Sequence, residues 1–213
     1  MSPFDSPNAE AERILAQLPH LHSIQGWLLV VEAVALFKLS TQIASLYPII
    51  CEIGSRKGKS SYVLASGLRR KTGRLYCIDP FDGRGDEASK HEYRSQIDRL
   101  TVSLRALFDE TMSRCGVFER ISVIPMTSQN ARSVFMESRI DLLFIDGNHD
   151  FEAVKLDYGF WSPLIPSGGT IVLHDVGARH VDGPRRVMED MIINNPMWTQ
   201  VHTVGEMGIA TRA

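Results

Sequence analysis

Hydrophobic residues along the chain follow two patterns. Short continuous apolar runs indicate strands buried on both faces of a sheet, whereas apolar residues spaced three and four positions apart indicate amphipathic helices. The last two runs alternate apolar with polar residues, which indicates an antiparallel pair at a sheet edge. The expected strands are 49–52, 74–79, 121–124, 142–145, 170–173, 199–204 and 208–211. The expected helices are 7–18, 26–46, 60–68, 92–115, 151–161 and 182–194.

These elements predict one domain that spans residues 1–213, with 44% hydrophobic residues to fill its core. Residues 1–46 form an N-terminal helical cap, and residues 47–213 form the core. The segment 83–116 is longer than a crossover needs and dense in charge, so it is either a lid over a site or a solvated helical face. The candidate substrate contacts in this segment are His91, Tyr93 and Arg94.

Composition excludes several classes of protein. Lys and Arg total 23 against 25 Asp and Glu, so a net charge of -2 gives no basis for a nucleic-acid partner. Three cysteines without a C-x-x-C pair argue against a disulfide framework and a zinc site. The early acidic residues Glu10 and Glu12 do not fit a secretory signal, and the longest apolar stretch, 27–39, is interrupted and too short for a bilayer. We expect a cytoplasmic protein without a membrane partner.

A pair of glycines follows the first expected strand. The apolar run ends in Glu52, Gly54 and Gly58 come next, and a helix-compatible segment begins near Ser60. This order predicts a strand, a tight turn and a helix N-terminus whose amides face the carboxyl edge of the sheet, where open α/β sheets bind ligands. The spacing lacks the middle glycine of a dinucleotide fingerprint and is one residue shorter than a phosphate-binding loop. The alternative is an ordinary strand-to-helix turn.

An acidic residue ends the second expected strand. Asp79 lies about twenty residues beyond the glycine turn, where a carboxylate can accept both ribose hydroxyls of an adenosine-containing ligand. Because Pro80 follows it, Asp79 could instead be a solvated turn residue, since Asp before Pro is common in loops.

Aspartate and histidine residues follow two later strands. Asp146 and His149 come after the run 142–145, and His174 and Asp175 come after 170–173. Adjacent parallel strands bring these four side chains to one edge of the sheet. Such clusters are typical of metal binding or acid–base chemistry.

The two blocks together resemble class I S-adenosylmethionine-dependent methyltransferases. The E-x-G-x-x-x-G order at 52–58 resembles motif I of that family. The segments 145–157 and 164–175, which read IDGNHDFEAVKLD and LIPSGGTIVLHD, are similar to the small-molecule subgroup that contains macrolide-sugar and aminocoumarin-sugar O-methyltransferases. The likeness covers residues 24–212 and implies a three-layer α/β sandwich. Its Rossmann-like, mostly parallel sheet has seven strands in the order 3-2-1-4-5-7-6, with strand 7 antiparallel.

The resemblance also implies a cofactor, S-adenosyl-L-methionine, and a small-molecule substrate that is methylated on a hydroxyl. The implied cofactor contacts are Glu52, Gly54, Ser55, Gly58, Ser60, Asp79, Pro80, Ser128 and Asp146. Ser128 falls in the turn after the third strand, which in this architecture lies beside the adenine.

A divalent cation, usually Mg²⁺, is a further implication, with Asp146, His174 and Asp175 as its ligands. His174 departs from the family pattern, in which a second carboxylate or amide is more common, so the presence and the identity of the metal stay open. The resemblance assigns the general base to His149 or Asp146. The alternative for His149 is a residue of the loop that caps the next helix.

Other functions remain consistent with these patterns. A nicotinamide-dependent oxidoreductase uses a similar sheet, and a non-catalytic ligand-binding protein can retain the fold. The helix 26–46 covers the sheet, caps the cofactor pocket or forms a homodimer contact. The loop 176–181 borders the predicted site, and its exposed candidates for substrate choice are Arg179 and His180.

Overall fold

The computed structural model describes residues 7–83 and 101–213. Its centre is a seven-stranded sheet in the order β3-β2-β1-β4-β5-β7-β6, which confirms the order that the family resemblance implies. All neighbouring strands are parallel except β7, which is antiparallel to both β5 and β6. The strands are β1 (Ile49–Ile53), β2 (Arg74–Ile78), β3 (Ile121–Ile124), β4 (Leu142–Ile145), β5 (Thr170–Leu173), β6 (Trp198–Val204) and β7 (Met207–Arg212).

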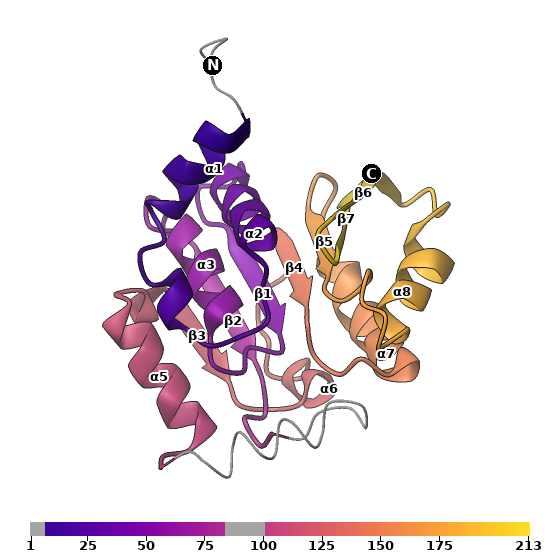
Figure 1. Ribbon diagram of the computed structural model, residues 1–213. Coiled ribbons are helices and arrows are strands. Elements are labelled where there is room, and N and C mark those ends of the chain that lie inside the picture. Colours follow the sequence, from indigo (N-terminus) through magenta and orange to yellow (C-terminus); the bar gives the residue numbers. More distant parts are fainter. Residues whose placement is uncertain (1–6, 84–100) are drawn as a thin grey trace.

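Helices cover both faces of this sheet (Figure 1). One face carries α1 (Pro7–Leu15), α2 (Val30–Gln42), α3 (Lys59–Gly67) and α5 (Leu104–Arg114). The other carries α6 (Ser128–Ala131), α7 (Phe151–Trp161) and α8 (Gly183–Val187). Short 3-10 turns lie at Leu21–Ser23, Phe118–Arg120 and Ser162–Leu164, and a π-helical turn covers Met188–Ile192. Within the described parts of the chain, no helix has both the length and the apolar character needed to cross a membrane.

The core consists of two layers, one on each face of the sheet. Along β4, Leu142 and Phe144 join the layer beneath α2 and α3, whereas Leu143 and Ile145 join the layer beneath α7. All four side chains are buried, which explains why this strand reads as a continuous apolar run. Each fully buried side chain of this size stabilises the fold by about 1.5–3 kcal/mol.

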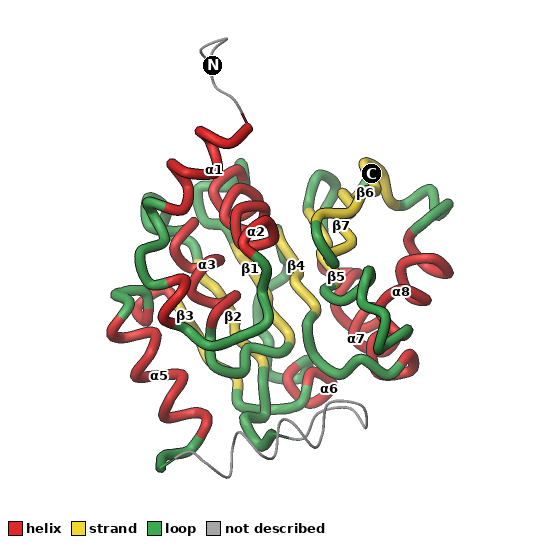
Figure 2. Tube along the Cα trace, viewed as in Figure 1, coloured by secondary structure: helices red, strands yellow, loops and turns green. Residues whose placement is uncertain are grey.

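The register of the strands aligns their carboxyl ends. Ile53 pairs with both Ile78 and Ile145, and Ile145 pairs with Leu173. The turns that follow β1, β2, β4 and β5 therefore leave the sheet at the same level, along its lower edge in Figure 2. This alignment brings residues from distant parts of the sequence to one site.

Several predicted helices have other bounds in the structure. The helix expected over 7–18 ends at Leu15, that over 26–46 ends at Gln42, and within the described residues that over 92–115 begins at Leu104. The helix expected over 26–46 begins only at Val30, because Leu29 is extended and its amide donates to Glu32 Oε2 at 2.8 Å. Residues 25–28, which precede the helix, line a cavity instead. The helix expected over 182–194 changes after Val187 into the π-helical turn.

The charged segment 83–116 is described only in part. Its helix α5 follows Ser103, whose hydroxyl accepts a hydrogen bond from the Ala106 amide at 3.1 Å. Phe108 and Met112 of α5 are fully buried in the core. The candidate substrate contacts His91, Tyr93 and Arg94 lie outside the described residues.

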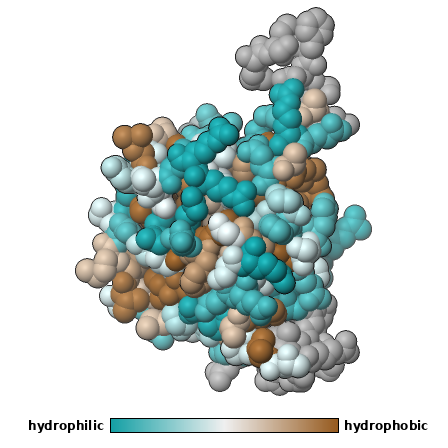
Figure 3. All heavy atoms as spheres, turned by 90° about the vertical axis from the view of Figure 1, so that its left-hand side faces the viewer, coloured by the Kyte–Doolittle hydropathy of each residue, from teal (hydrophilic) through white to brown (hydrophobic). Residues whose placement is uncertain are grey.

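Large apolar side chains are also exposed near the start of α2. Trp27, Leu29, Val30 and Val31 are among the exposed hydrophobic residues. The face of the molecule in Figure 3 is mainly hydrophilic, with hydrophobic residues gathered toward its lower left.

Candidate active site

A cavity of about 320 Å³ lies at the carboxyl edge of the sheet. Its walls come from the turns after β1 to β5 and from residues 25–28, which precede α2. The predicted site residues that line it are Gly54, Ser55, Ser60, Asp79, Pro80, Ser128, Asp146, His149, His174 and Asp175. Glu52 and Gly58 do not line it. The fold therefore brings ten of the predicted residues into one cavity.

Gly54 lies where the ends of two strands touch. Its φ of +88° belongs to the left-handed region that favours glycine. A Cβ at this position would stand 2.0 Å from the Asp146 carbonyl oxygen and 2.8 Å from the Gly147 Cα. Only glycine fits this position. Gly58 has the same φ, but a Cβ there would meet the Met112 side chain at 2.6 Å, so its role is to let α3 pack close to α5.

Glu52 stabilises the glycine turn through hydrogen bonds inside the core. Its side chain is fully buried, and Oε2 accepts hydrogen bonds from Ser55 Oγ at 2.7 Å, from Ser61 Oγ and from Cys77 Sγ at 3.3 Å. Burial raises the pKa of Glu52 above its usual value, although hydroxyl donors oppose this effect. In this geometry Glu52 fixes the glycine turn and does not face the cavity, despite the direct cofactor contact that the resemblance implies.

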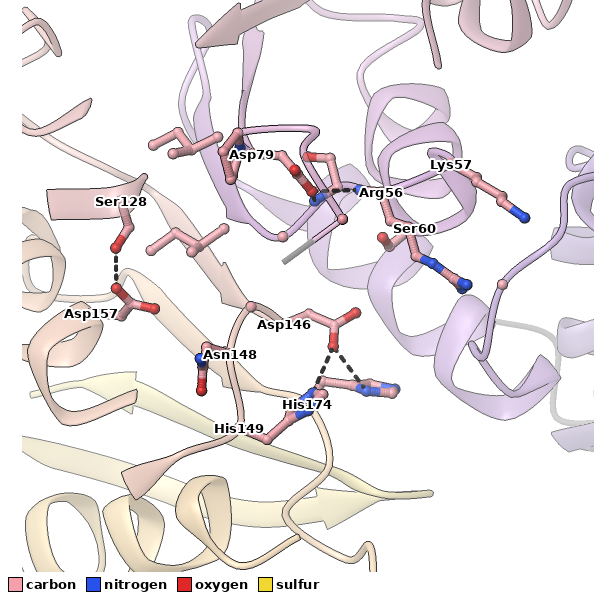
Figure 4. A pocket seen from close by; sticks show the side chains of 18 of the residues that line it. Arg56, Lys57, Ser60, Asp79, Ser128, Asp146, Asn148, His149, Asp157 and His174 are labelled. Atoms are coloured by element: carbon pink, nitrogen blue, oxygen red, sulfur yellow. Dashed lines mark hydrogen bonds and ion pairs between the residues drawn. The ribbon is translucent and has the colours of Figure 1, made fainter. Parts of the chain in front are cut away.

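Asp79 faces the same cavity as Gly54 and also holds the turn. Oδ2 accepts from the amide of Arg56 at 2.8 Å (Figure 4) and from that of Ser55 at 3.0 Å, and Oδ1 accepts from the Phe81 amide at 2.6 Å. Burial raises the pKa of Asp79, while these three amides act in the opposite direction. Sequence reasoning placed Asp79 in the site but did not predict its bonds to the turn. The Arg56 guanidinium stacks 4.0 Å from the Trp27 ring at the cavity wall.

Asp157, a carboxylate that sequence reasoning missed, also lines the cavity. Ser128, at the start of α6, donates a hydrogen bond to Asp157 Oδ1 from α7 (Figure 4). Asp157 is only 4% exposed, and burial raises its pKa to about 6 although the Ser128 hydroxyl lowers it. One signal was available in the sequence. Asp157 stands on the same helical face as Val154, Tyr158 and Trp161, which are buried, and an acid on an apolar face needs a partner.

Asp146 and His149, which follow β4, and His174 and Asp175, which follow β5, converge into a cluster that we call the polar centre. His149 Nε2 lies 3.0 Å from Asp175 Oδ2 and 4.0 Å from Asp146 Oδ1. His174 Nδ1 lies 3.3 Å from Asp146 Oδ1 and 3.2 Å from Asp175 Oδ2. Figure 4 shows Asp146 pointing toward both imidazoles. The backbone of Asp175 adopts φ +58°, a strained conformation for aspartate that is often found at functional sites.

Glu32 is the second residue that sequence reasoning missed. It extends from α2, is fully buried, and its Oε2 lies 3.2 Å from His174 Nε2. Its Oε1 accepts from the Glu206 amide at 2.7 Å. Although burial opposes ionisation, the bonds from His174 and from two backbone amides lower the pKa of Glu32. Glu32 thus connects α2 to the β6–β7 hairpin and to the polar centre by hydrogen bonds.

Opposite charges dominate the electrostatics of this centre. Burial lowers the pKa of His149, but hydrogen bonds and charges from Asp146 and Asp175 outweigh it and raise the value to about 10. Burial also opposes the charge on His174, yet the surrounding carboxylates raise its pKa well above the usual range. The pKa values of Asp146 and Asp175 are lowered despite burial, because the imidazoles stabilise both carboxylates.

The centre also has the composition of a metal site. Asp146, His149 and Asp175 each offer one ligand atom, all within 4.8 Å of one another. The set expected from the sequence contained His174 in place of His149. The geometry therefore adds His149 to the candidate ligands.

Comparisons with known proteins agree with this architecture. A family model described as a methyltransferase domain matches residues 51–176. Solved structures with the same fold include a Bacillus cereus O-methyltransferase in complex with SAH (17% identity, TM-score 0.63, covering 99% of this chain and 94% of that one). Another is the Streptomyces achromogenes O-methyltransferase TomG, involved in tomaymycin synthesis, in complex with SAM (16% identity, TM-score 0.61, 100% and 93%). A third is the SAH-bound Podospora anserina methyltransferase PaMTH1 (13% identity, TM-score 0.66, 100% and 98%).

At these identities the structural matches establish the fold, while the family model covers more than half of the chain. Its match runs from the strand before the glycine turn to the loop after the polar centre, and so includes both sequence blocks that carry the resemblance. The chain therefore belongs to the methyltransferase domain family and has the fold of the class I S-adenosylmethionine-dependent enzymes.

Proposed function

We propose that this protein is an S-adenosylmethionine-dependent O-methyltransferase acting on a hydroxyl of a small polar molecule. The observation that carries the proposal is that Gly54, Asp79 and the polar centre open into one cavity. A methyl donor bound along the glycine turn would thus lie next to groups able to activate an acceptor. The solved relatives with SAM or SAH support the same cofactor.

The cavity offers a partner for each part of the cofactor. We place the ribose hydroxyls at Asp79, whose carboxylate retains acceptor capacity beyond its three amide bonds. The adenine lies at Ser128 and Asp157, where its amino group can donate to the buried carboxylate. The sulfonium then lies toward Asp146, at the end of β4.

An acceptor has room beside this cavity. A second hollow is lined by His149, Asp150, residues 176–182 and Arg185, and it shares His149 with the first. We place the substrate there, so the loop 176–181 with Arg179 and His180 helps to determine substrate choice. A hydroxyl at His149 would then face the methyl group, and holding the two at reacting distance supplies much of the rate enhancement.

The proton of this hydroxyl leaves to His149 or Asp146. Asp146 lines the cofactor cavity and is ionised, because its pKa is lowered, whereas His149 lines the acceptor hollow and must first lose the proton that its raised pKa retains. Either acts as general base while the oxygen attacks the methyl carbon and the sulfur leaves with its bonding pair. A divalent cation held in the centre would instead stabilise the oxygen anion. The homodimer contact and the cytoplasmic location stay predictions of the sequence.

Calorimetric titration of the full-length protein with S-adenosylhomocysteine and with NADH tests the cofactor. We expect the first ligand alone to bind. Asp79→Ala should weaken binding at least tenfold, while Asp190→Ala, at an exposed position of the π-helical turn, should not. Binding of NADH in preference, or of neither ligand, would contradict the proposal. With an acceptor from a panel of hydroxylated small molecules, His149→Ala and Asp146→Ala should slow turnover more than they weaken cofactor affinity.

A further inference from the structure

Four side-chain atoms of the polar centre converge, and most of the distances between their nitrogens and oxygens match those that a single metal ion imposes. Ligand atoms bound to one first-row ion at 2.0–2.2 Å lie roughly 3.0–3.6 Å apart. Four nitrogen–oxygen distances connect Asp146 Oδ1, His149 Nε2, His174 Nδ1 and Asp175 Oδ2. Three of them, 3.0, 3.2 and 3.3 Å, lie within this range, and the distance from His149 Nε2 to Asp146 Oδ1, 4.0 Å, exceeds it. Two nitrogens and two oxygens thus converge from two adjacent strand ends.

The orientation of His174 independently indicates a ligand. Its side chain is 4% exposed, and among the described residues no hydrogen bond of good geometry reaches Nδ1, although two carboxylate oxygens lie within 3.3 Å. Nδ1 therefore points into the centre without a partner suited to its direction. A buried nitrogen in this position fits a metal ligand.

Glu32 completes the arrangement from behind. His174 Nε2, the nitrogen that faces away from the centre, lies 3.2 Å from Glu32 Oε2. Histidine ligands usually donate this second N–H to a carboxylate or carbonyl, which fixes the ring and makes the ligating nitrogen more basic. Gly205 leaves room for Glu32, because a Cβ there would lie 2.6 Å from Glu32 Oε1.

We propose that Asp146, His149, His174 and Asp175 form a binding site for a first-row transition ion, such as Mn²⁺, Co²⁺ or Zn²⁺, and that Glu32 orients His174 toward it. The family resemblance implies Mg²⁺ in this position. The residues present fit a divalent cation, but two imidazoles favour a transition ion, since Mg²⁺ prefers an all-oxygen octahedral shell. The inference rests on the proposed function only in that the ion would serve the same reaction centre.

Metal binding by the full-length, chelator-treated protein tests this inference without an activity assay. Calorimetric titrations with Co²⁺, Zn²⁺ and Mg²⁺ should show one equivalent of Co²⁺ or Zn²⁺ bound, and Mg²⁺ bound about 100-fold more weakly or not at all. The visible absorption of bound Co²⁺ reports its nitrogen ligands. Addition of S-adenosylhomocysteine in a separate titration checks that the cofactor cavity is folded.

Substitutions assign the ligands. His149→Gln and His174→Gln should each abolish or strongly weaken Co²⁺ binding, and Glu32→Gln should weaken it about 10–100-fold. His22→Gln removes an exposed histidine on the first 3-10 turn and is the matched control, expected to change nothing. His174→Asn offers an amide oxygen near the position of Nδ1, at the cost of the donor to Glu32, so the ion preference of this variant should move toward Mg²⁺.

Three results would overturn the inference. These are absence of Co²⁺ and Zn²⁺ binding, Mg²⁺ bound as tightly as the transition ions, or Co²⁺ binding that survives both histidine-to-glutamine variants. The outcome is separable from that of the proposed function. Cofactor binding without metal binding defeats only the metal site, and metal binding without cofactor binding defeats only the methyltransferase assignment.

Discussion

Replacing the buried carboxylate of Asp157 by an amide gives a quantitative test of the cavity. Asp157→Asn keeps the shape of the side chain, and its carbonyl oxygen can still accept from Ser128. The substitution removes only the ability of this side chain to ionise. Burial raises the pKa of Asp157 from 3.8 to about 6, so the folded protein holds this proton more tightly than the unfolded chain does.

The sign and size of the effect follow from this difference. Below pH 4 both states are protonated and Asp157 costs nothing. As the pH rises through 4 to 6, only the unfolded chain ionises, so the folded state loses stability. Above pH 6 the loss is complete and amounts to about 3 kcal/mol. Because Asp157 is 4% exposed, solvent screening reduces this figure little.

Urea denaturation, followed by tryptophan fluorescence between pH 4.5 and 8, measures the effect. The free energy of unfolding of the wild type should fall relative to Asp157→Asn as the pH rises, with the other carboxylates cancelling in the comparison. Asp190→Asn, at an exposed position, should track the wild type. Parallel curves for the wild type and Asp157→Asn would refute the reasoning.

The same carboxylate links pH to the cofactor. If the adenine amino group donates to Asp157, S-adenosylhomocysteine binds the ionised form better, so its affinity should rise through pH 6. Asp157→Asn should remove that rise. An affinity that is independent of pH in the wild type would place the adenine elsewhere.

Three further substitutions probe the turn and the adenine end. Gly54→Ala should reduce the free energy of unfolding by roughly 2–5 kcal/mol, because it adds a clash with Asp146 to the strain of a positive φ. Gly168 also has a positive φ but has open space around it, so Gly168→Ala should cost only about 1–2 kcal/mol. Equal losses of stability for the two variants in thermal or urea unfolding would show that the predicted clash with Asp146 contributes nothing. Asp79→Asn sets an NH₂ group against a backbone N–H and should reduce the free energy of unfolding by about 1–3 kcal/mol. It should also weaken S-adenosylhomocysteine binding at least tenfold, and unchanged affinity by calorimetry would argue against the ribose assignment. Ser128→Ala removes the donor to Asp157 and so raises the pKa of this carboxyl further. The loss of stability with rising pH should then extend to higher pH than in the wild type, and a loss confined to lower pH would contradict the pairing.

The sequence by itself determined the sheet and the place of the site. A strand buried on both faces must be apolar throughout, and for this reason the run at 142–145 matches β4 residue for residue. The glycine spacing located the turn, since only glycine readily adopts the positive φ of Gly54. The residues just after parallel strands must meet at one edge, and this rule alone predicts that Asp146, His149, His174 and Asp175 lie together, as they do in the cavity.

Tertiary structure alone decided which partner each polar side chain meets. Glu32 and His174 stand 142 residues apart, and Ser128 and Asp157 stand 29 apart on different helices. Periodicity gives the face on which a side chain lies, but not the depth at which one layer packs against the next. That depth placed Glu52 next to the hydroxyls of Ser55 and Ser61, and directed the carboxylate of Asp79 onto the backbone amides of Ser55 and Arg56. Such contacts depend on positions fixed by the whole core, so no local pattern in the chain could specify them.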